Sequence, residues 1–174
     1  MNNGKFIITW VDYLLISGLL LLTFPITVHS APQEKHPIGW IENIQLSKDF
    51  VIPAKIDTGA RHSSINSPDY KLITKNDEQW VNFTLANGKG NKFNVEKKII
   101  RHTRIKRKGQ EAKQRPVILL GICVANVYKE AEVNLANRQN FNYQVLIGRS
   151  FLTGNFTVDP ELKHTTKPAC NQTM

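Results

Sequence analysis

The sequence predicts an all-β domain that closes into a barrel with little helix. Short segments of alternating apolar and polar residues recur along the chain, turn residues such as Asn87-Gly88 separate them, and no long amphipathic helix competes. The chain has 174 residues, of which 41% are hydrophobic. This length and composition predict one ordinary domain with a packed core.

Residues 1–30 are expected to direct export. Lys5 precedes an apolar stretch, and Val28 and Ser30 suit a cut before Ala31, as in a signal peptide. The alternative is an uncleaved membrane anchor at residues 6–28. Both interpretations place the folded domain in the periplasm, either free or anchored to the inner membrane, with residues 31–37 as a linker.

The folded domain is expected at residues 38–160. An apolar stretch, Phe50-Val51-Ile52, leads past Pro53 into a strand, and proline is tolerated at a strand start. Residues 70–79 are expected to be irregular, and residues 161–174 to form a polar tail. Strands are expected at residues 38–46, 54–56, 80–85, 92–95, 99–106, 116–125, 130–135 and 143–147, with a short helical turn at 150–154.

Two cysteines, Cys123 and Cys170, have two interpretations. In an exported protein they can form a lasting disulfide. Alternatively, Cys123 is a buried thiol within its apolar run and Cys170 remains free in the tail. The sequence leaves both open.

An Asp-Thr-Gly-Ala turn, residues 57–60, follows the strand at 54–56. Two carboxylates that share one proton provide an acid and a base for peptide hydrolysis. Asp57 would supply one carboxylate, and Gly59 would let the backbone approach it closely. The chain has one such turn, so the second carboxylate would come from the partner in a two-fold homodimer. The alternative is an Asx turn without catalytic function.

This turn and a later segment, Ile147-Gly148-Arg149, resemble the motifs of retropepsin-like aspartic peptidases. The match is closest to a bacterial branch often labelled ATP-dependent zinc proteases, and it covers about residues 38–159. The resemblance implies a closed acid-protease barrel in which Asp57 is catalytic. The supporting residues would be Thr58, Gly59, Ala60, Gly148 and Arg149, with Thr58 contacting the opposing chain.

Arg61 differs from the acidic residue that retroviral enzymes have after Asp-Thr-Gly-Ala. Arg149 therefore needs another partner, and Asp159 or Glu42 is expected. We expect Arg61 to bind a substrate carboxylate through its planar guanidinium, and His62 to be a second substrate contact. The alternative for both is an exposed surface side chain.

The formal net charge of +9 indicates an acidic partner. Basic residues crowd residues 97–115, where a positive ridge would attract a glutamate-rich peptide, and a solvated hairpin is the alternative. Nucleic acid is an unlikely partner, because no recognised nucleic-acid-binding motif is present. No metal and no cofactor are expected, since the histidines have no zinc-binding spacing and no phosphate-binding glycine loop is present.

The function predicted from these features is an aspartic endopeptidase that acts on acidic peptides as a homodimer. The alternative is a non-catalytic exported barrel that binds acidic peptide or cell-envelope polymer.

Overall fold

The computed structural model describes residues 34–105, 109 and 111–171. The expected leader, whether signal peptide or anchor, lies outside these residues. No helix in the described part of the chain is both long and apolar enough to cross a membrane.

The described residues form eleven strands and one short helix, which confirms the all-β fold class. The strands are β1 (His36–Ser47), β2 (Phe50–Asp57), β3 (Ser63–Asn66), β4 (Lys71–Lys75), β5 (Glu78–Ala86), β6 (Lys92–Lys98), β7 (Arg101–Ile105), β8 (Lys113–Val124), β9 (Val127–Ala136), β10 (Val145–Gly148) and β11 (Phe156–Lys163), and the helix is α1 (Arg149–Leu152).

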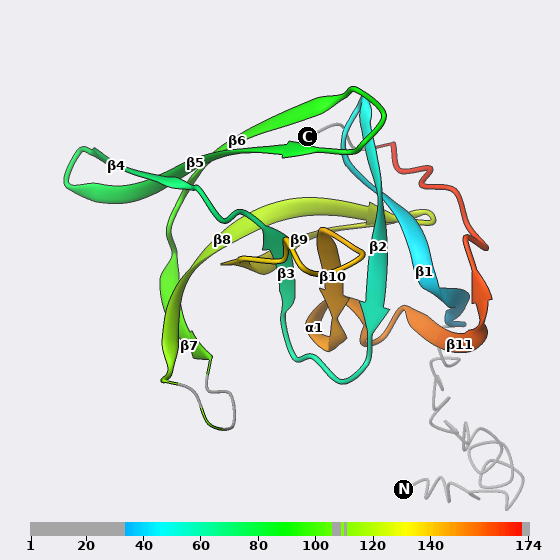
Figure 1. Cartoon of the computed structure of the whole chain (residues 1–174). Coiled ribbons are helices and arrows are strands. Elements are labelled where there is room, and N and C mark those ends of the chain that lie inside the picture. The colour runs from blue at the N-terminus through cyan, green and yellow to red at the C-terminus, as the bar shows by residue number, and fades with distance from the viewer. Residues whose placement is uncertain (1–33, 106–108, 110, 172–174) are drawn as a thin grey trace, which may run out of the picture. The chain divides into compact units, whose positions relative to one another are not determined.

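Six of the strands close into a barrel (Figure 1). They pair in the order β1-β2-β10-β3-β9-β8, and β8 returns to β1 through Ile44 opposite Val124 and Gln45 opposite Cys123. β11 extends this sheet as a parallel neighbour of β1, and β7 extends it as an antiparallel neighbour of β8. Closure pairs both edges of each barrel strand, which favours a fixed register.

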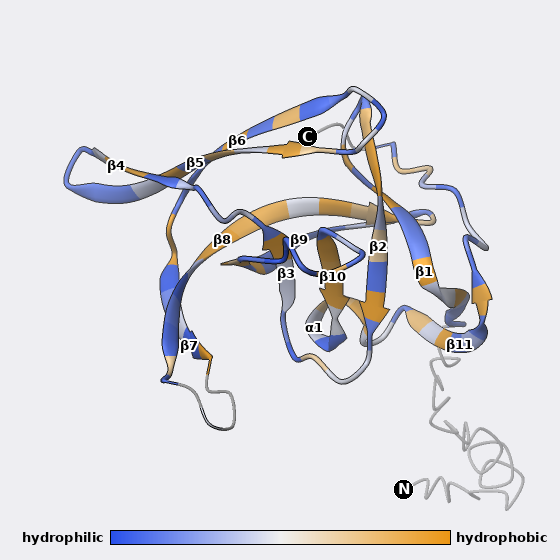
Figure 2. Cartoon of the chain, viewed as in Figure 1, coloured by the Kyte–Doolittle hydropathy of each residue, from blue (hydrophilic) through white to orange (hydrophobic). Residues whose placement is uncertain are grey.

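The core is mainly aliphatic with a few phenylalanines, and its apolar pattern follows the strand positions (Figure 2). β10 has all four residues buried because it lies between β2 and β3. Ile44, Ile56 and Ile118 are likewise buried and belong to one cluster of apolar side chains. Each such side chain contributes roughly 1.5–3 kcal/mol relative to an exposed position.

A separate three-stranded sheet, β4-β5-β6, packs on this core. Val81, Phe83 and Val95 on its inner face are buried within the same apolar cluster, and Phe93 stacks on Phe50 with ring centroids 5.4 Å apart. The expectation that residues 70–79 are irregular is wrong, because β4 and the start of β5 lie there. β4 is a largely exposed edge strand, so its sequence has little apolar alternation.

β11 was not expected, and it continues past residue 160 to Lys163. β11 is mostly exposed and contains a proline, so its own side chains give little strand pattern. It is a strand because it pairs with β1. Residues 164–170, here called the C-terminal strap, then follow β1 toward β8. His164 donates its backbone N–H to the carbonyl of Ile41, at 2.7 Å, so the expected polar tail is in contact with the barrel.

The strap makes two strong attachments. Cys170 forms a disulfide with Cys123 of β8, which decides between the two interpretations of the cysteines. Thr165 and Thr166 donate backbone and hydroxyl hydrogen bonds to the carboxylate of Glu42, which is fully buried in β1. Burial alone would raise the pKa of Glu42, but these donors and the Gly39 N–H outweigh it and lower that pKa.

Two short elements remain, the barrel strand β3 and the helix α1. β3 was not expected, because Ser63-Ser64-Ile65-Asn66 has little apolar pattern, yet it pairs with both β9 and β10. α1 begins at Arg149 and ends at Leu152, one residue earlier at its start than expected, with Phe151 and Leu152 buried.

Candidate active site

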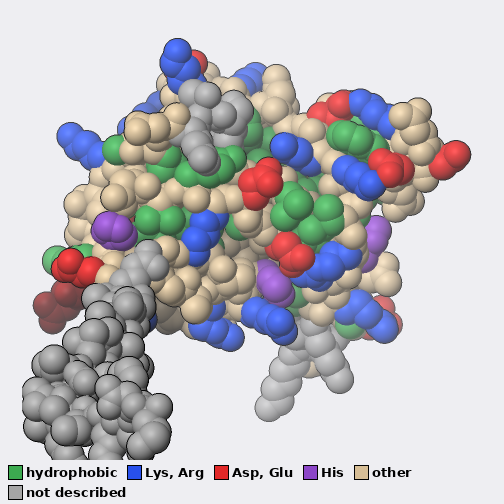
Figure 3. Space-filling model, turned by 180° about the vertical axis from the view of Figure 1, so that it is seen from behind, with side chains coloured by type: hydrophobic (Ala, Val, Ile, Leu, Met, Phe, Trp, Pro, Cys, Tyr) green, Lys and Arg blue, Asp and Glu red, His purple; other side chains and the backbone are tan. Residues whose placement is uncertain are grey.

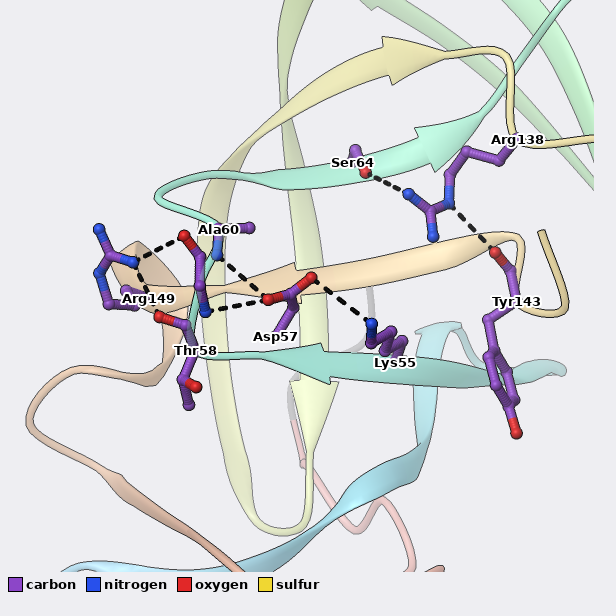
Figure 4. Close-up of polar contacts among 9 residues, drawn as sticks. Lys55, Asp57, Thr58, Ala60, Ser64, Arg138, Tyr143 and Arg149 are labelled. Carbon is purple, nitrogen blue, oxygen red and sulfur yellow. Dashed lines mark hydrogen bonds and ion pairs between the residues drawn. The ribbon is translucent and has the colours of Figure 1, made fainter. Parts of the chain in front are cut away.

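β2 and β10 bring the two sequence motifs side by side. The strands run parallel, and the register places Gly148 opposite Asp57 although about ninety residues separate them in the sequence. Asp57 is the last residue of β2, so its side chain lies where the sheet gives way to the turn at residues 57–60 (Figure 4). We call these four residues the Asp57 turn.

The Asp57 carboxylate is held by the backbone of its own turn. Oδ1 accepts hydrogen bonds from the N–H of Gly59, at 2.9 Å, and of Ala60, at 3.2 Å. Oδ2 lies 3.9 Å from Nζ of Lys55, and the Asp57 side chain remains 26% exposed. The Asx-turn geometry is therefore present, and it leaves Oδ2 facing away from the backbone donors, where a second carboxylate or a water could reach it.

Glycine is required at position 148 by a close backbone approach. A Cβ atom at Gly148 would lie 2.6 Å from the carbonyl carbon of His62. At Gly59 a Cβ atom would lie 3.2 Å from Oδ1 of Asp57. The first contact is with backbone and cannot be relieved by a side-chain rotation, so a side chain at position 148 would displace the segment after the turn.

Arg149 braces the Asp57 turn, but with a different partner from the expected one. Its Nη1 donates to the carbonyl oxygens of Thr58, at 2.8 Å, and Gly59, at 2.9 Å (Figure 4). The expectation of a carboxylate partner at Asp159 or Glu42 is wrong, since Glu42 binds the strap and Asp159 accepts from the Glu161 N–H. Two main-chain carbonyls replace the acid, because Arg61 stands where an acid would be.

The start of α1 is also tied to the segment after the turn. Backbone N–H groups of Arg149 and Ser150 donate to the carbonyls of Ala60 and Arg61, each at 2.9 Å. Ser63 Oγ accepts from the Gly148 N–H at 3.2 Å. The Asp57 turn, Arg61 and α1 are thus connected through backbone hydrogen bonds.

A cavity of about 280 Å³ opens beside the Asp57 turn. Ala60, Arg61 and His62 form one wall, and strands β7, β8 and β9 form another. We call it the arginine cavity, because four guanidinium groups line it: Arg61, Arg101, Arg115 and Arg138. Arg61 and His62 therefore both line this cavity, close to the candidate catalytic residue.

Glu132 of β9 organises one side of this region. Its carboxylate receives two hydrogen bonds from Arg101, through Nε at 3.3 Å and through Nη2, and its Oε2 lies 3.7 Å from Nδ1 of His62. The Arg101 hydrogen bond lowers the pKa of Glu132. Burial, with the charges of Arg101 and Arg61, lowers the pKa of His62 against the opposing effect of Glu132.

Sequence reasoning did not single out Glu132 or Arg138, which carry no motif. Arg101 and Arg115 lay in the expected basic ridge, but that ridge is divided. Lys98 belongs to the separate sheet, where it pairs with Glu78, and Arg104 does not line the arginine cavity. On the face in Figure 3, Lys and Arg side chains are dispersed among acidic ones rather than gathered in one patch.

No group of three or more His, Cys, Asp or Glu side chains that could hold a metal ion occurs among the described residues. The polar groups around Asp57 are main-chain donors and cations, a set that suits a carboxylate and not a divalent metal.

A closed β-barrel that presents an Asp-Thr-Gly turn beside a Gly-Arg crossing strand defines the retropepsin-like class. The family model described as "Retropepsin-like aspartic endopeptidase RimB" matches residues 37–169, and the chain belongs to this family.

Two sequence relatives and one solved structure are similar to this chain. Proteins named "Probable alpha-L-glutamate ligase" from Shewanella pealeana and Shewanella halifaxensis are 32% and 33% identical over 112 residues, or 63% of this chain. The chain spans about a quarter of the length of these relatives, since the match covers 24% of each. A crystal structure of a protein of unknown function from Legionella pneumophila is similar with a TM-score of 0.65 and 30% identity, covering 77% of this chain and 100% of that one.

Proposed function

We propose that the chain is an aspartic endopeptidase that hydrolyses peptide bonds as a two-fold homodimer. The observation that carries this proposal is the Asp57 carboxylate, fixed at the end of a barrel strand by backbone donors to Oδ1 while the side chain remains 26% exposed. The family description supports it. Each chain supplies one such carboxylate, and the two-fold axis would bring two of them together.

In this mechanism the two Asp57 carboxyl groups share one proton, because like charges that close cannot both ionise. The ionised group takes a proton from a water molecule as its oxygen attacks the peptide carbonyl carbon. The protonated group gives its proton to the carbonyl oxygen. The tetrahedral intermediate then breaks its C–N bond: the carboxyl group that took the water proton gives it to the amine nitrogen, and a hydroxyl of the intermediate gives its proton to the other carboxylate, which restores the shared proton.

The proposed substrate is an acidic, glutamate-rich peptide. Four of the residues that line the arginine cavity are arginines, and Glu132 next to His62 is an acid beside it, so a substrate carboxylate would meet an excess of positive charge there. The names of the ligase relatives add glutamate chemistry to this argument. Their ligase activity is not carried over, because most of their length has no counterpart in this chain.

The direct test is digestion of an unbiased peptide library by wild type and by Asp57→Asn. We expect Asp57→Asn to lower the cleavage rate by at least a hundredfold, because the neutral amide cannot share the proton. Asp77→Asn is the matched control, since Asp77 lies in the exposed β4–β5 turn at φ 60°, a conformation that asparagine adopts readily. Cleavage by Asp57→Asn at the wild-type rate would contradict the proposal.

The second candidate is a non-catalytic barrel that binds acidic peptide or envelope polymer. The arginine cavity favours it independently of Asp57, since that cavity would bind anions in either case. Retained binding of acidic peptide, with no Asp57-dependent cleavage of any library member, would favour this candidate.

We also propose that the domain acts in the periplasm, free or anchored by the leader. The Cys123–Cys170 disulfide supports an oxidising compartment. Cell fractionation followed by N-terminal sequencing tests this proposal and shows whether the leader is cut before Ala31. Recovery in the cytoplasm with both thiols reduced would contradict it.

A further inference from the structure

A second cavity, of about 390 Å³, lies next to the arginine cavity. Three segments that are distant in the sequence line it: residues 67–70 between β3 and β4, Ile105 of β7 with residues 111–116, and residues 135–141 at the end of β9 and beyond. We call it the distal cavity. Ile105 and Arg115 line both cavities, so the two share a wall. A peptide that leaves the arginine cavity past these two residues would reach the distal cavity.

Phe141 gives the distal cavity an aromatic wall that is already in place. The residue is 50% exposed. Its backbone N–H donates to the carbonyl of Arg138 at 2.9 Å, and the Arg138 guanidinium carbon lies 4.7 Å from the centroid of its ring. Arg138 is only 7% exposed and is itself held by Tyr143 and Ser64. The ring therefore lies on a fixed support, and a contact that is fixed before binding costs little ordering entropy.

Four further residues extend the apolar lining: Pro68, Tyr70, Ile105 and Pro116. Tyr70 packs against the apolar core cluster, and Pro116 is buried. The lining thus combines aromatic and cyclic side chains that have few rotatable bonds. Cavities with this kind of lining suit an apolar or aromatic group.

Four carboxamide side chains supply the polar part of the lining: Gln114, Asn137, Gln139 and Asn140. Asn137 and Gln139 hydrogen-bond each other through side chain and backbone. Gln114 and Asn140 are exposed and form no such pair with another residue in the part of the chain that the structure describes. A carboxamide offers both a donor and an acceptor, which is the combination that a peptide main chain requires.

The charged residues of the distal cavity nearly balance. Glu111 and Lys113 both line it, are exposed and have opposite charges. Arg115 directs Nη1 to Oδ1 of Asn134, at 3.2 Å, and Asn134 lines the arginine cavity but not the distal one. The distal cavity therefore lacks the large positive excess of the arginine cavity. An uncharged side chain suits it better than an ionised one, which would lose its hydration without a matching partner.

We propose that the distal cavity is a second subsite, which takes an apolar or aromatic side chain of the peptide substrate while Gln114 and Asn140 hold the adjacent main chain. The occupant is a peptide because the cavity continues from the candidate active site and its carboxamides match a peptide backbone. This inference rests on the proposed function and adds an uncharged element to substrate recognition. A uniformly acidic peptide is then a poorer substrate than one that carries an apolar residue at the matching position.

A positional scan tests the preference. One series of glutamate-rich peptides of equal length carries Ala at each position in turn, and a matched series carries Phe there. Mass spectrometry of the products locates the cut. At a fixed distance from the cut, we expect kcat/KM for Phe to exceed that for Ala by at least about tenfold, because an aromatic side chain is buried there. Equal rates for Phe and Ala at every position would overturn the inference.

The role of Phe141 is tested by the Phe-to-Ala rate ratio at that position, which is independent of how much protein is folded. Phe141→Ala should bring the ratio close to one. Leu72→Ala is the matched control, since Leu72 is also an exposed apolar residue but lies on β4 and does not line the distal cavity. It should keep the wild-type ratio. A wild-type ratio in Phe141→Ala would contradict the assignment.

Gln114→Leu tests the main-chain contact. The variant keeps a side chain of similar size without the donor and acceptor, so kcat/KM for the preferred Phe peptide should fall roughly two- to tenfold. Gln79→Leu is the control, because Gln79 is exposed on β5 and does not line the cavity. Equal rates for Gln114→Leu and wild type would contradict the contact.

Binding to Asp57→Asn separates the distal subsite from the catalytic proposal. Fluorescence anisotropy of the labelled Phe and Ala peptides measures recognition without cleavage. Phe-selective binding that is lost in the double variant Asp57→Asn, Phe141→Ala, with no cleavage by wild type, would uphold the subsite and contradict the peptidase. Asp57-dependent cleavage with equal affinities and rates for the Phe and Ala peptides would uphold the peptidase and contradict the subsite.

Discussion

Arg149 shows how one residue replaces a missing ion pair. An arginine that pairs with an acidic side chain of a turn holds the turn through that side chain. Arg149 instead donates to the main-chain carbonyl oxygens of the turn. The resemblance to retropepsin-like peptidases indicated that Arg149 supports the site. The sequence could not give the partner, since a carbonyl acceptor is present at every residue and leaves no pattern.

We predict that Arg149→Met lowers kcat/KM by roughly ten- to a hundredfold, because two hydrogen bonds from a charged donor are lost. Peptide cleavage under steady-state conditions measures the effect. Arg104→Met is the control for loss of a surface arginine. Wild-type activity in Arg149→Met would mean that the turn keeps its shape without the brace.

Glu42 gives a pH-dependent contribution to stability. Its carboxylate is fully buried and its pKa is lowered in the folded protein. A lowered folded pKa means that the contribution is complete above the unfolded carboxyl's pKa of about 4.3 and is lost as the pH falls through the folded value.

We therefore predict that the free energy of unfolding decreases as the pH is lowered from about 7 to about 3. Glu42→Gln should be less stable than wild type at neutral pH by roughly 1–3 kcal/mol, and this difference should shrink in acid. Urea unfolding across the pH range measures both. Glu161→Gln, at an exposed position of β11, should follow wild type, and a pH-independent loss in Glu42→Gln would contradict the ionic origin.

At the scale of elements, the strap depends on a covalent link. The disulfide joins Cys123 and Cys170 across a separation of 47 residues, and the same strap supplies the donors for Glu42. Loss of the disulfide should therefore free the end of the strap and weaken the hydrogen bonds that the strap donates to Glu42.

Cys170→Ser should lower the free energy of unfolding by about 2–4 kcal/mol. Chemical denaturation with and without reductant measures this effect. Reductant should destabilise wild type by a similar amount and leave Cys170→Ser unchanged. A variant as stable as oxidised wild type would show that the noncovalent contacts of the strap are sufficient.

Strands were predictable from the sequence where one face of the strand, or all of its residues, are buried. β2, β5, β8 and β10 carry apolar residues in the pattern that the barrel requires, so their places were predictable. β3, β4 and β11 were not, because their strand character comes from pairing with distant strands rather than from their own side chains. The arginine cavity was equally hidden, since it combines side chains from five separate segments.

At the scale of the whole molecule, the proposed enzyme is an assembly of two chains. Activity per unit mass should fall on dilution, because a single chain contributes one Asp57 and the dyad would be lost. Assaying cleavage over a concentration series, with sedimentation measured in parallel, checks this. Constant specific activity through the range in which the chains separate would contradict the homodimer.

Mixing gives an independent form of the same prediction. Adding excess Asp57→Asn chains to wild type should reduce activity through mixed dimers, whereas adding Asp77→Asn chains should not. The control carries its own intact Asp57 and so differs only in whether it can complete the pair. Equal effects of the two variants would contradict a shared site.

The carbonyls of Ala60 and Arg61 accept hydrogen bonds from the start of α1, so the cavity wall and the Asp57 turn are rigidly connected. A force on Arg61 from a bound peptide would be transmitted to the Asp57 carboxylate, the proposed catalytic group, a few residues away. Peptide affinity and catalytic alignment should then change together, so that ill-fitting peptides are slow to react as well as weakly held.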